Sequence, residues 1–223
     1  RGSEGLTLDE TGDLFALIQS PLNVDGKTAK TAKYTRIVEF NPTTKSTTMY
    51  SYPVDTGYKN TGAAKLGDIT SIGHKQFLII EQGKQQGHMQ NRIYKIDLNG
   101  ATPISNTGDL EYGRLDGKIV PAKKELVLDL RAYGWNIEKA EGLALLPDRK
   151  TIAVVNDNDF GIAINVKDNQ VKQADVSDYT YDSNKKVFLY KDNTVHPIKL
   201  GLKQNAPTER ESQIWFFTLP HTL

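Results

Sequence analysis

The sequence contains no cysteine. This excludes disulfide bonds, thiolate metal sites and a cysteine nucleophile. An excess of one charge is also missing, since 28 basic and 27 acidic side chains leave a net charge of +1. The overall charge therefore gives no reason to expect a nucleic acid or an anionic membrane as partner. No apolar run approaches the roughly 20 residues that a membrane-spanning helix needs.

The signatures of several enzyme classes are missing as well. There is no Gly-x-Ser-x-Gly nucleophile turn of a serine hydrolase and no glycine-rich loop that would hold a phosphate. The four histidines show no paired metal-binding spacing. Candidate chemistry must therefore come from carboxylates, amides and cationic side chains.

Sustained helical periodicity is absent too, and short apolar segments take its place. These segments are rich in β-branched and aromatic residues and are bounded by Gly, Pro, Asn and Asp, as strands are. The predicted strands are 14–18, 36–40, 77–80, 92–98, 126–130, 152–155 and 214–219. The sequence therefore predicts an all-β protein.

One hairpin recurs along the chain. Two copies open with Glu4-Gly5-Leu6 and Glu141-Gly142-Leu143, a degenerate copy starts at Gly67, and an apolar second strand follows each opening. Third strands are expected at 35–40, 91–96 and 212–217, and fourth strands at 47–53 and 102–105. Repeated four-stranded antiparallel units predict a β-propeller. A β-sandwich is the competing all-β fold, and the repeated hairpin argues against it.

About three blades are visible in a single predicted domain, 1–223. A closed propeller needs at least four blades, and the chain opens at Arg1 without a Met. We therefore expect an incomplete propeller whose open edge is covered by a lost N-terminal fragment or by a second copy of the chain. A polar stretch at about 161–210 is expected to be an insertion that contains a strand at 187–190.

The repeat predicts where a ligand site lies. In a propeller, the start of each first strand and the end of each second strand lie near one channel mouth, which would gather Glu4, Gln19, Glu81, Glu141, Asn156 and Asp157. Crowded carboxylates repel one another unless a hard cation lies among them, and calcium suits such oxygen ligands. The predicted metal ligands are Glu4, Glu141, Asn156, Asp157 and Asp159, and the predicted catalytic carboxylates are Glu4, Glu81 and Glu141.

Two simpler interpretations stay open for these residues. The Asn156 to Asp159 run could be only a turn, because Asn and Asp side chains cap their own backbone. The glutamates before Gly-Leu could accept backbone amides between blades. Arg1 and Lys139 lie close to a Glu-Gly-Leu element in sequence, and together with Gln19 they are candidates to bind an anionic substrate. They could instead pair with neighbouring carboxylates.

Several segments resemble a known family. They are RGSEGLTLDETGDLFALIQSPL from Arg1, FLIIEQG from Phe77, RIYKIDLNGA from Arg92, LVLDL from Leu126, EGLALLPDRKTIAVVNDNDFG from Glu141 and the closing IWFFTLP. Together they are similar to the phytase-like, esterase-like propeller family of bacterial proteins. The resemblance implies hydrolysis of a phosphate or carboxylic ester, calcium as a candidate cofactor, and a secreted or periplasmic location. It also implies further blades before the Arg1 segment.

Three functions remain open at this point. The first is a metal-dependent hydrolase that acts on a small anionic or ester substrate at the channel mouth. The second is a propeller that binds a ligand or partner, with structural calcium and no catalysis. The third is a scaffold whose active blades lie elsewhere.

Overall fold

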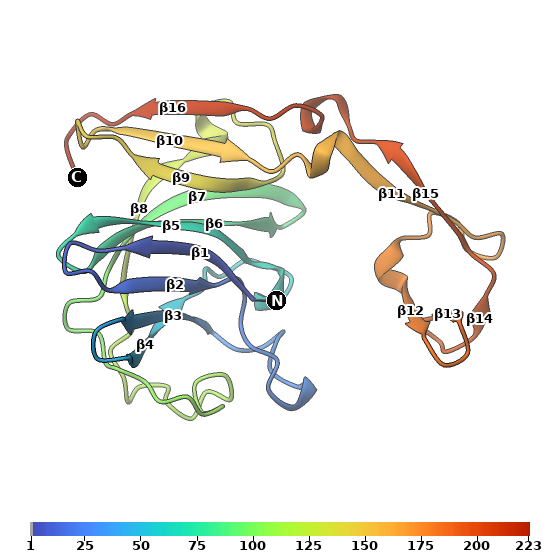
Figure 1. Ribbon diagram of the computed structural model, residues 1–223, viewed down its shortest axis with the longest axis horizontal. Coiled ribbons are helices and arrows are strands. Elements are labelled where there is room, and N and C mark those ends of the chain that lie inside the picture. Colours follow the sequence, from blue (N-terminus) through green and yellow to red (C-terminus); the bar gives the residue numbers. More distant parts are fainter. Residues whose placement is uncertain (1) are drawn as a thin grey trace. The chain divides into compact units, whose positions relative to one another are not determined.

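The computed structural model describes residues 2–223 (Figure 1). Within this range the chain forms strands and short 3-10 turns and no α-helix, which confirms the all-β class. The 3-10 turns are Val24–Gly26, Thr61–Ala63, Leu130–Tyr133, Asp159–Gly161, Val176–Asp178 and Pro207–Glu209. None of these helices is long and apolar enough to cross a membrane. The chain divides into two compact units, of which the second is Asn158–Ser212 and the first is the remainder.

The first unit consists of three antiparallel sheets (Figure 1). The first sheet has the order β1 (Ser3–Leu8), β2 (Leu14–Ile18), β3 (Tyr34–Asn41) and β4 (Ser46–Pro53). The second has the order β5 (Lys65–Gly73), β6 (Gln76–Gln85), β7 (His88–Asp97) and β8 (Lys123–Asp129). The third has β10 (Thr151–Asn156) between β9 (Ala140–Leu145) and β16 (Ile214–Thr218). No ladder between strands of different sheets closes them into a ring over residues 2–223.

The second strand of each hairpin occupies an inner place in its sheet, as its apolar sequence predicts. The packing of strand β6 explains why residues 77–80 are all apolar. Phe77 and Ile79 pack into the core shared with the first sheet, whereas Leu78 and Ile80 pack into the core shared with the third. Because successive side chains of a strand point to opposite faces, a sheet that is covered on both faces needs apolar residues at every position.

The fourth strand of the second sheet was wrongly predicted at 102–105. It is β8, and Ile104 makes only an isolated bridge to Met49. The loop between β7 and β8 runs instead along the first sheet, where the Ile104 amide donates to the Met49 carbonyl at 2.9 Å. A buried ion pair between Arg36 and Glu111, at 2.7 Å, ties the same loop to β3. Nothing in the spacing of the apolar residues signals this detour.

The first strands of successive sheets lie against one another, β1 beside β5 and β5 beside β9. The contact is close enough to require glycine. A Cβ on Gly5 would lie 2.6 Å from the Ile69 nitrogen, and one on Gly67 would lie 2.3 Å from the Ala140 oxygen. Close backbone packing between sheets therefore explains Gly5 and Gly67, whereas a Cβ on Gly142 would lie 3.3 Å from the Val155 side chain of its own sheet.

The second unit has two small sheets of its own. Strands β11 (Ile162–Lys167) and β15 (Lys199–Gln204) form a ribbon, and β12 (Tyr179–Asp182), β13 (Val187–Tyr190) and β14 (Val195–His196) form the other sheet. The polar stretch expected at 161–210 falls inside this unit. The chain then returns to the first unit, where β16 pairs with β10 in the register Ile152 opposite Phe217. This confirms the predicted pairing of 214–219 with 152–155.

Candidate functional site

A pocket of about 710 Å³ gathers residues from all three sheets of the first unit. Its volume falls within the range usual for small-molecule sites. The lining residues are Glu4, Gln19, Ala63, Lys65, Gly67, Gln82, Gly83, Lys84, Met89, Glu138, Lys139, Glu141 and Asp157. The pocket therefore brings together five residues that the sequence proposed for one mouth, namely Glu4, Gln19, Lys139, Glu141 and Asp157.

Irregular pairing places the two repeated glutamates. In β1 the register with β2 shifts between Ser3 and Gly5, so that Glu4 has no direct partner. In β9 the same irregularity leaves Glu141 without a direct partner opposite β10. A residue of this kind is turned away from the regular alternation of the strand. In both Glu-Gly pairs the glutamate is therefore left out of the regular ladder, and in the first pair Gly5 also allows the next sheet to approach closely.

The carboxyl group of Glu141 lies in a strongly perturbing environment. Burial raises the pKa of Glu141 to about 7, and the negative charges of Glu4 and Asp157 add to this effect. The positive charge of Lys139 and a hydrogen bond from Gln82 act in the opposite direction. A carboxyl group with a pKa near neutrality can exchange a proton under physiological conditions.

The hydrogen bond to Glu141 belongs to a chain of side chains with a fixed direction. Gln82 Nε2 donates to Glu141 Oε1 at 2.9 Å, while Gln82 Oε1 accepts from Asn91 Nδ2 at 2.7 Å and from the Ala140 amide at 2.8 Å. Asn91 Oδ1 in turn accepts from Arg131 Nε at 2.7 Å. Since Arg131 can only donate, each amide must turn its NH₂ group toward Glu141.

Gln82, Asn91 and Arg131 are site residues that the sequence did not predict. Gln82 and Asn91 lie 2% and 0% exposed, and they are direct partners in the β6–β7 ladder. Two amides that face each other in a buried ladder are the signal that could have found them, but it requires the register of the hairpin.

Glu4, Lys139 and Asp157, which also line the pocket, have side-chain partners as well. Gln19 Nε2 donates to Glu4 Oε1 at 2.5 Å, and Lys139 Nζ lies 3.1 Å from Asp157 Oδ2. The pairing of Lys139 with a neighbouring carboxylate is one of the alternatives that the sequence left open. Lys65 and Lys84 add further positive charge to the lining. The pocket is therefore polar and mixed in charge.

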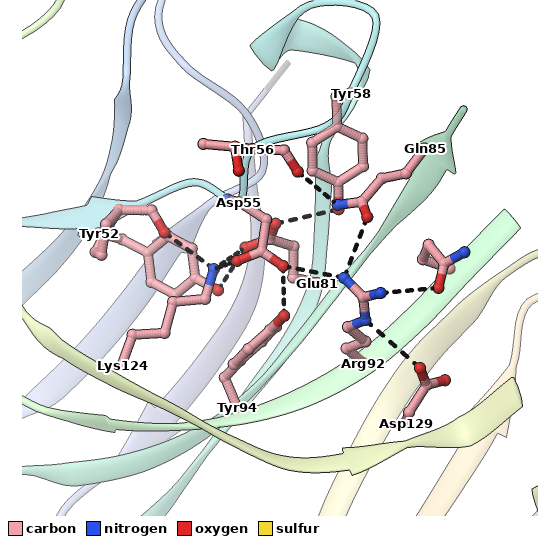
Figure 2. Close-up of polar contacts among 12 residues, drawn as sticks. Tyr52, Asp55, Thr56, Tyr58, Glu81, Gln85, Arg92, Tyr94, Lys124 and Asp129 are labelled. Carbon is pink, nitrogen blue, oxygen red and sulfur yellow. Dashed lines mark hydrogen bonds and ion pairs between the residues drawn. The ribbon is translucent and has the colours of Figure 1, made fainter. Parts of the chain in front are cut away.

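Glu81 does not join this pocket, so its predicted place beside Glu4 is corrected. Figure 2 shows its carboxylate in a separate buried network. It accepts from Tyr52 Oη at 2.7 Å and Tyr58 Oη at 3.1 Å, and it pairs with Lys124 Nζ at 2.6 Å. The reason is strand alternation. Glu81 shares the parity of Phe77 and Ile79 and faces the first sheet, whereas Gln82 faces the third.

The same network links several strands (Figure 2). Lys124 Nζ also binds Asp55 Oδ1 at 2.6 Å and lies 4.1 Å from the centre of the Tyr94 ring. Arg92 contacts Asp55 at 3.3 Å and Asp129 at 3.6 Å. Burial, with the nearby carboxylates, raises the pKa of Tyr52 and Tyr94 well above the usual range. These tyrosines therefore stay neutral, as donors that hold the carboxylates in place.

The remaining predicted residues lie elsewhere. Asn156 is buried, and its Oδ1 accepts from the Gln213 amide at 2.6 Å. It therefore joins the ends of β10 and β16 instead of lining the pocket, which corrects its predicted place at the mouth. Asp159 belongs to the second unit. Arg1 lies outside the described residues.

A calcium ion takes six to eight oxygen ligands. Across residues 2–223, no group of three or more His, Asp or Glu side chains is placed to hold a metal ion. In the pocket Glu4, Glu141 and Asp157 each have a side-chain donor or a lysine as partner. The residues as placed do not fit a calcium site, and calcium binding stays a prediction.

The comparisons with known proteins identify the family of the chain. The family model for phytase-like proteins, described as esterase-like activity of phytase, matches residues 1–160. Neither the curated proteins nor the solved structures include a match. The matched segment contains both Glu-Gly-Leu hairpins and every described residue that lines the pocket. Since it covers well over half of the sequence, the chain belongs to the phytase-like family described by esterase-like activity.

Proposed function

We propose that the protein hydrolyses a carboxylic or phosphate ester in the pocket around Glu141, with Glu141 as the general base. The observation that carries this proposal is the setting of its carboxyl group. It lines a pocket of substrate size, one of its oxygens is held by Gln82, and its pKa is raised to about 7. When the pKa of a base is near the working pH, a large fraction of the base is ionised and it still accepts a proton readily. Membership of the family supports the hydrolase class.

For a carboxylic ester, Glu141 in its ionised form takes a proton from a water molecule as the water oxygen attacks the carbonyl carbon. The carbonyl electrons move to oxygen and form a tetrahedral oxyanion. When this collapses, the bond to the alkoxide breaks, and the protonated Glu141 returns the proton to the departing oxygen. Ester and water thus become acid and alcohol, and Glu141 is regenerated.

The neighbouring residues have distinct roles in this proposal. Glu4, held by Gln19, keeps the pKa of Glu141 high through its negative charge. Lys139 and Lys84 supply positive charge for the oxyanion and for an anionic substrate. Calcium is proposed only as a ligand to be tested, because no step depends on it.

We also propose that the three sheets are successive blades of a β-propeller. Two features support this architecture. The first strands of the sheets lie against one another, and the pocket gathers where those strands begin. This is the arrangement expected near a propeller axis.

The test is turnover of p-nitrophenyl acetate and p-nitrophenyl phosphate by the whole chain, with and without a chelator. We expect turnover that Glu141→Gln lowers at least about a hundredfold, with Glu125→Gln as the exposed control. Loss of turnover in chelator would support calcium dependence. No turnover of either ester, or full activity of Glu141→Gln, would contradict the proposal and favour a binding protein.

A further inference from the structure

A second hollow adjoins the pocket around Glu141. Its volume is about 560 Å³, and it is lined by Pro21, Leu22, Asn23, Ala29, Lys30, Asn60, Gly62 and Ala63. We call it the side groove. Ala63 lines both hollows, so the two lie next to each other at this residue.

One wall of the side groove is fixed by its own hydrogen bonds. The Thr28 hydroxyl donates to the Leu22 carbonyl at 2.6 Å and accepts from the Val24 amide at 2.8 Å. The Thr28 carbonyl accepts from the Ala32 amide at 2.9 Å. Thr28 is buried and closes this loop on itself. The wall is therefore held in one conformation before any ligand binds.

The opposite wall is held against the first. A Cβ on Gly62 would lie 2.5 Å from the Ala29 carbonyl oxygen, so the two loops touch through their backbones. Ser20 Oγ, which is buried, donates to the Ala64 carbonyl at 2.9 Å and ties the same loops together. A preformed groove is the usual form of a small-molecule site.

The chemistry of the side groove differs from that of the pocket. Four of its lining residues, Pro21, Leu22, Ala29 and Ala63, are apolar, and Asn23 and Asn60 are neutral. Lys30 is the single ionisable residue of the lining, and no carboxylate is present. Such a surface can bind an apolar group, and it offers few charged partners to a densely charged group.

We propose that the side groove binds an apolar arm of the substrate, so that the preferred substrates are carboxylic esters with an extended alkyl or aryl arm. This rests on the proposed ester hydrolysis at Glu141. The reacting ester lies beside Glu141, and the arm passes Ala63 to contact Leu22 and Ala29. A densely phosphorylated substrate would leave this groove unused.

The first experiment compares kcat/KM for p-nitrophenyl acetate, butyrate and octanoate. We expect the ratio of octanoate to acetate to exceed about ten, because each buried methylene group adds discrimination. Ala63→Phe, which narrows the passage, should lower this ratio at least severalfold. Ala144→Phe, on the exposed face of β9, should leave it unchanged. A ratio near one in the original protein would overturn the proposal.

A second measurement separates the groove from the chemistry. Octanoate, the product acid, is titrated into methyl-labelled protein and followed by NMR. We expect shifts at Leu22 and Ala29 that are lost in Ala63→Phe and kept in Glu141→Gln. Shifts without any ester turnover would show that the side groove binds the acid and would contradict the proposed hydrolase function. Turnover without these shifts would support the hydrolase function and contradict the binding of an apolar arm in the side groove. If Ala63→Phe does not fold, Leu22→Asn takes its place, and the expected loss is then that of the Ala29 shift.

Discussion

Burial and two negatively charged neighbours oppose the ionisation of the Glu141 carboxyl group. If the ionised form is the base, turnover should fall as the pH drops through about 7, the pKa to which Glu141 is raised. A pH–rate profile of kcat/KM tests this. An acidic limb near pH 4, where an ordinary glutamate titrates, would contradict the assignment.

Glu141 in its ionised form should lower the stability of the fold. A carboxyl group whose pKa is raised by folding favours the fold when it is protonated, and this contribution is lost as the pH rises through about 7. Glu141→Gln should therefore raise the melting temperature at pH 8 relative to the original protein. The difference should vanish near pH 4, below the unfolded pKa. A lower melting temperature of the variant at pH 8 would show that ionised Glu141 stabilises the fold.

The direction of the amide chain should set the pH dependence. In Asn91→Leu the Gln82 carbonyl loses one of the two donors that turn it away from Glu141, and only the Ala140 amide remains. The amide can then present oxygen to the carboxylate, which raises the pKa of Glu141 and moves the acidic limb upward by about half a unit to one unit. Gln204→Leu, on the exposed strand β15, is the control. A folded Asn91→Leu variant with an unmoved limb would refute this role.

At the scale of elements, the contact between first strands makes a sharp prediction. Gly67→Ala should destabilise the first unit by about 1–3 kcal/mol, because its Cβ would meet the Ala140 carbonyl oxygen at 2.3 Å. Gly2→Ala has open space around the added Cβ and should change little. Urea unfolding measures both. Equal stability of the two variants would mean that β5 and β9 can separate without cost.

The network between the first and second sheets should be strongly stabilising as a unit. Lys124→Met would leave the buried carboxylate of Glu81 and the half-buried carboxylate of Asp55 without their shared cation. We expect a loss of about 3–5 kcal/mol in the free energy of unfolding. Lys123→Met, at an exposed neighbouring position, is the control. A loss below 1 kcal/mol would mean that the carboxylates become protonated or hydrated instead.

Elements with a complete local signal could be predicted from the sequence. The apolar runs of β2, β6 and β10 identify strands that are covered on both faces, and the repeated Glu-Gly pair identifies Glu4 and Glu141. Glu81 was misplaced because the predicted strand ended at residue 80, whereas β6 continues to Gln85. Glu81 and Gln82 are therefore neighbours within one strand and point to opposite sheets, and the sequence alone does not say which of these sheets lines the pocket. The path of the loop after β7 depends on Arg36 and Glu111, which are far apart in the sequence and meet only in the fold.

At the scale of the whole molecule, the second unit enters and leaves the first at one place. The Asn156 amide donates to the Gln213 carbonyl at 3.3 Å, so the two ends of the first unit are neighbours there. Replacing Asn158–Ser212 with a short Gly-Ser linker should therefore leave the first unit folded, with an unchanged titration of Glu141. Circular dichroism and NMR of labelled glutamates measure this. An unfolded product would show that the second unit supports the first.

The pairing of β10 with β16 across this excursion also sets an order of events on the ribosome. When β10 has emerged from the ribosome, its partner β16 has not yet been made, because the whole second unit is translated between β10 and β16. At roughly 5–20 residues per second, the free edge of β10 is exposed for several seconds in every nascent chain. Chaperones that shield such edges should therefore be needed most at this stage, and slower codons within the second unit should lower the yield of soluble protein.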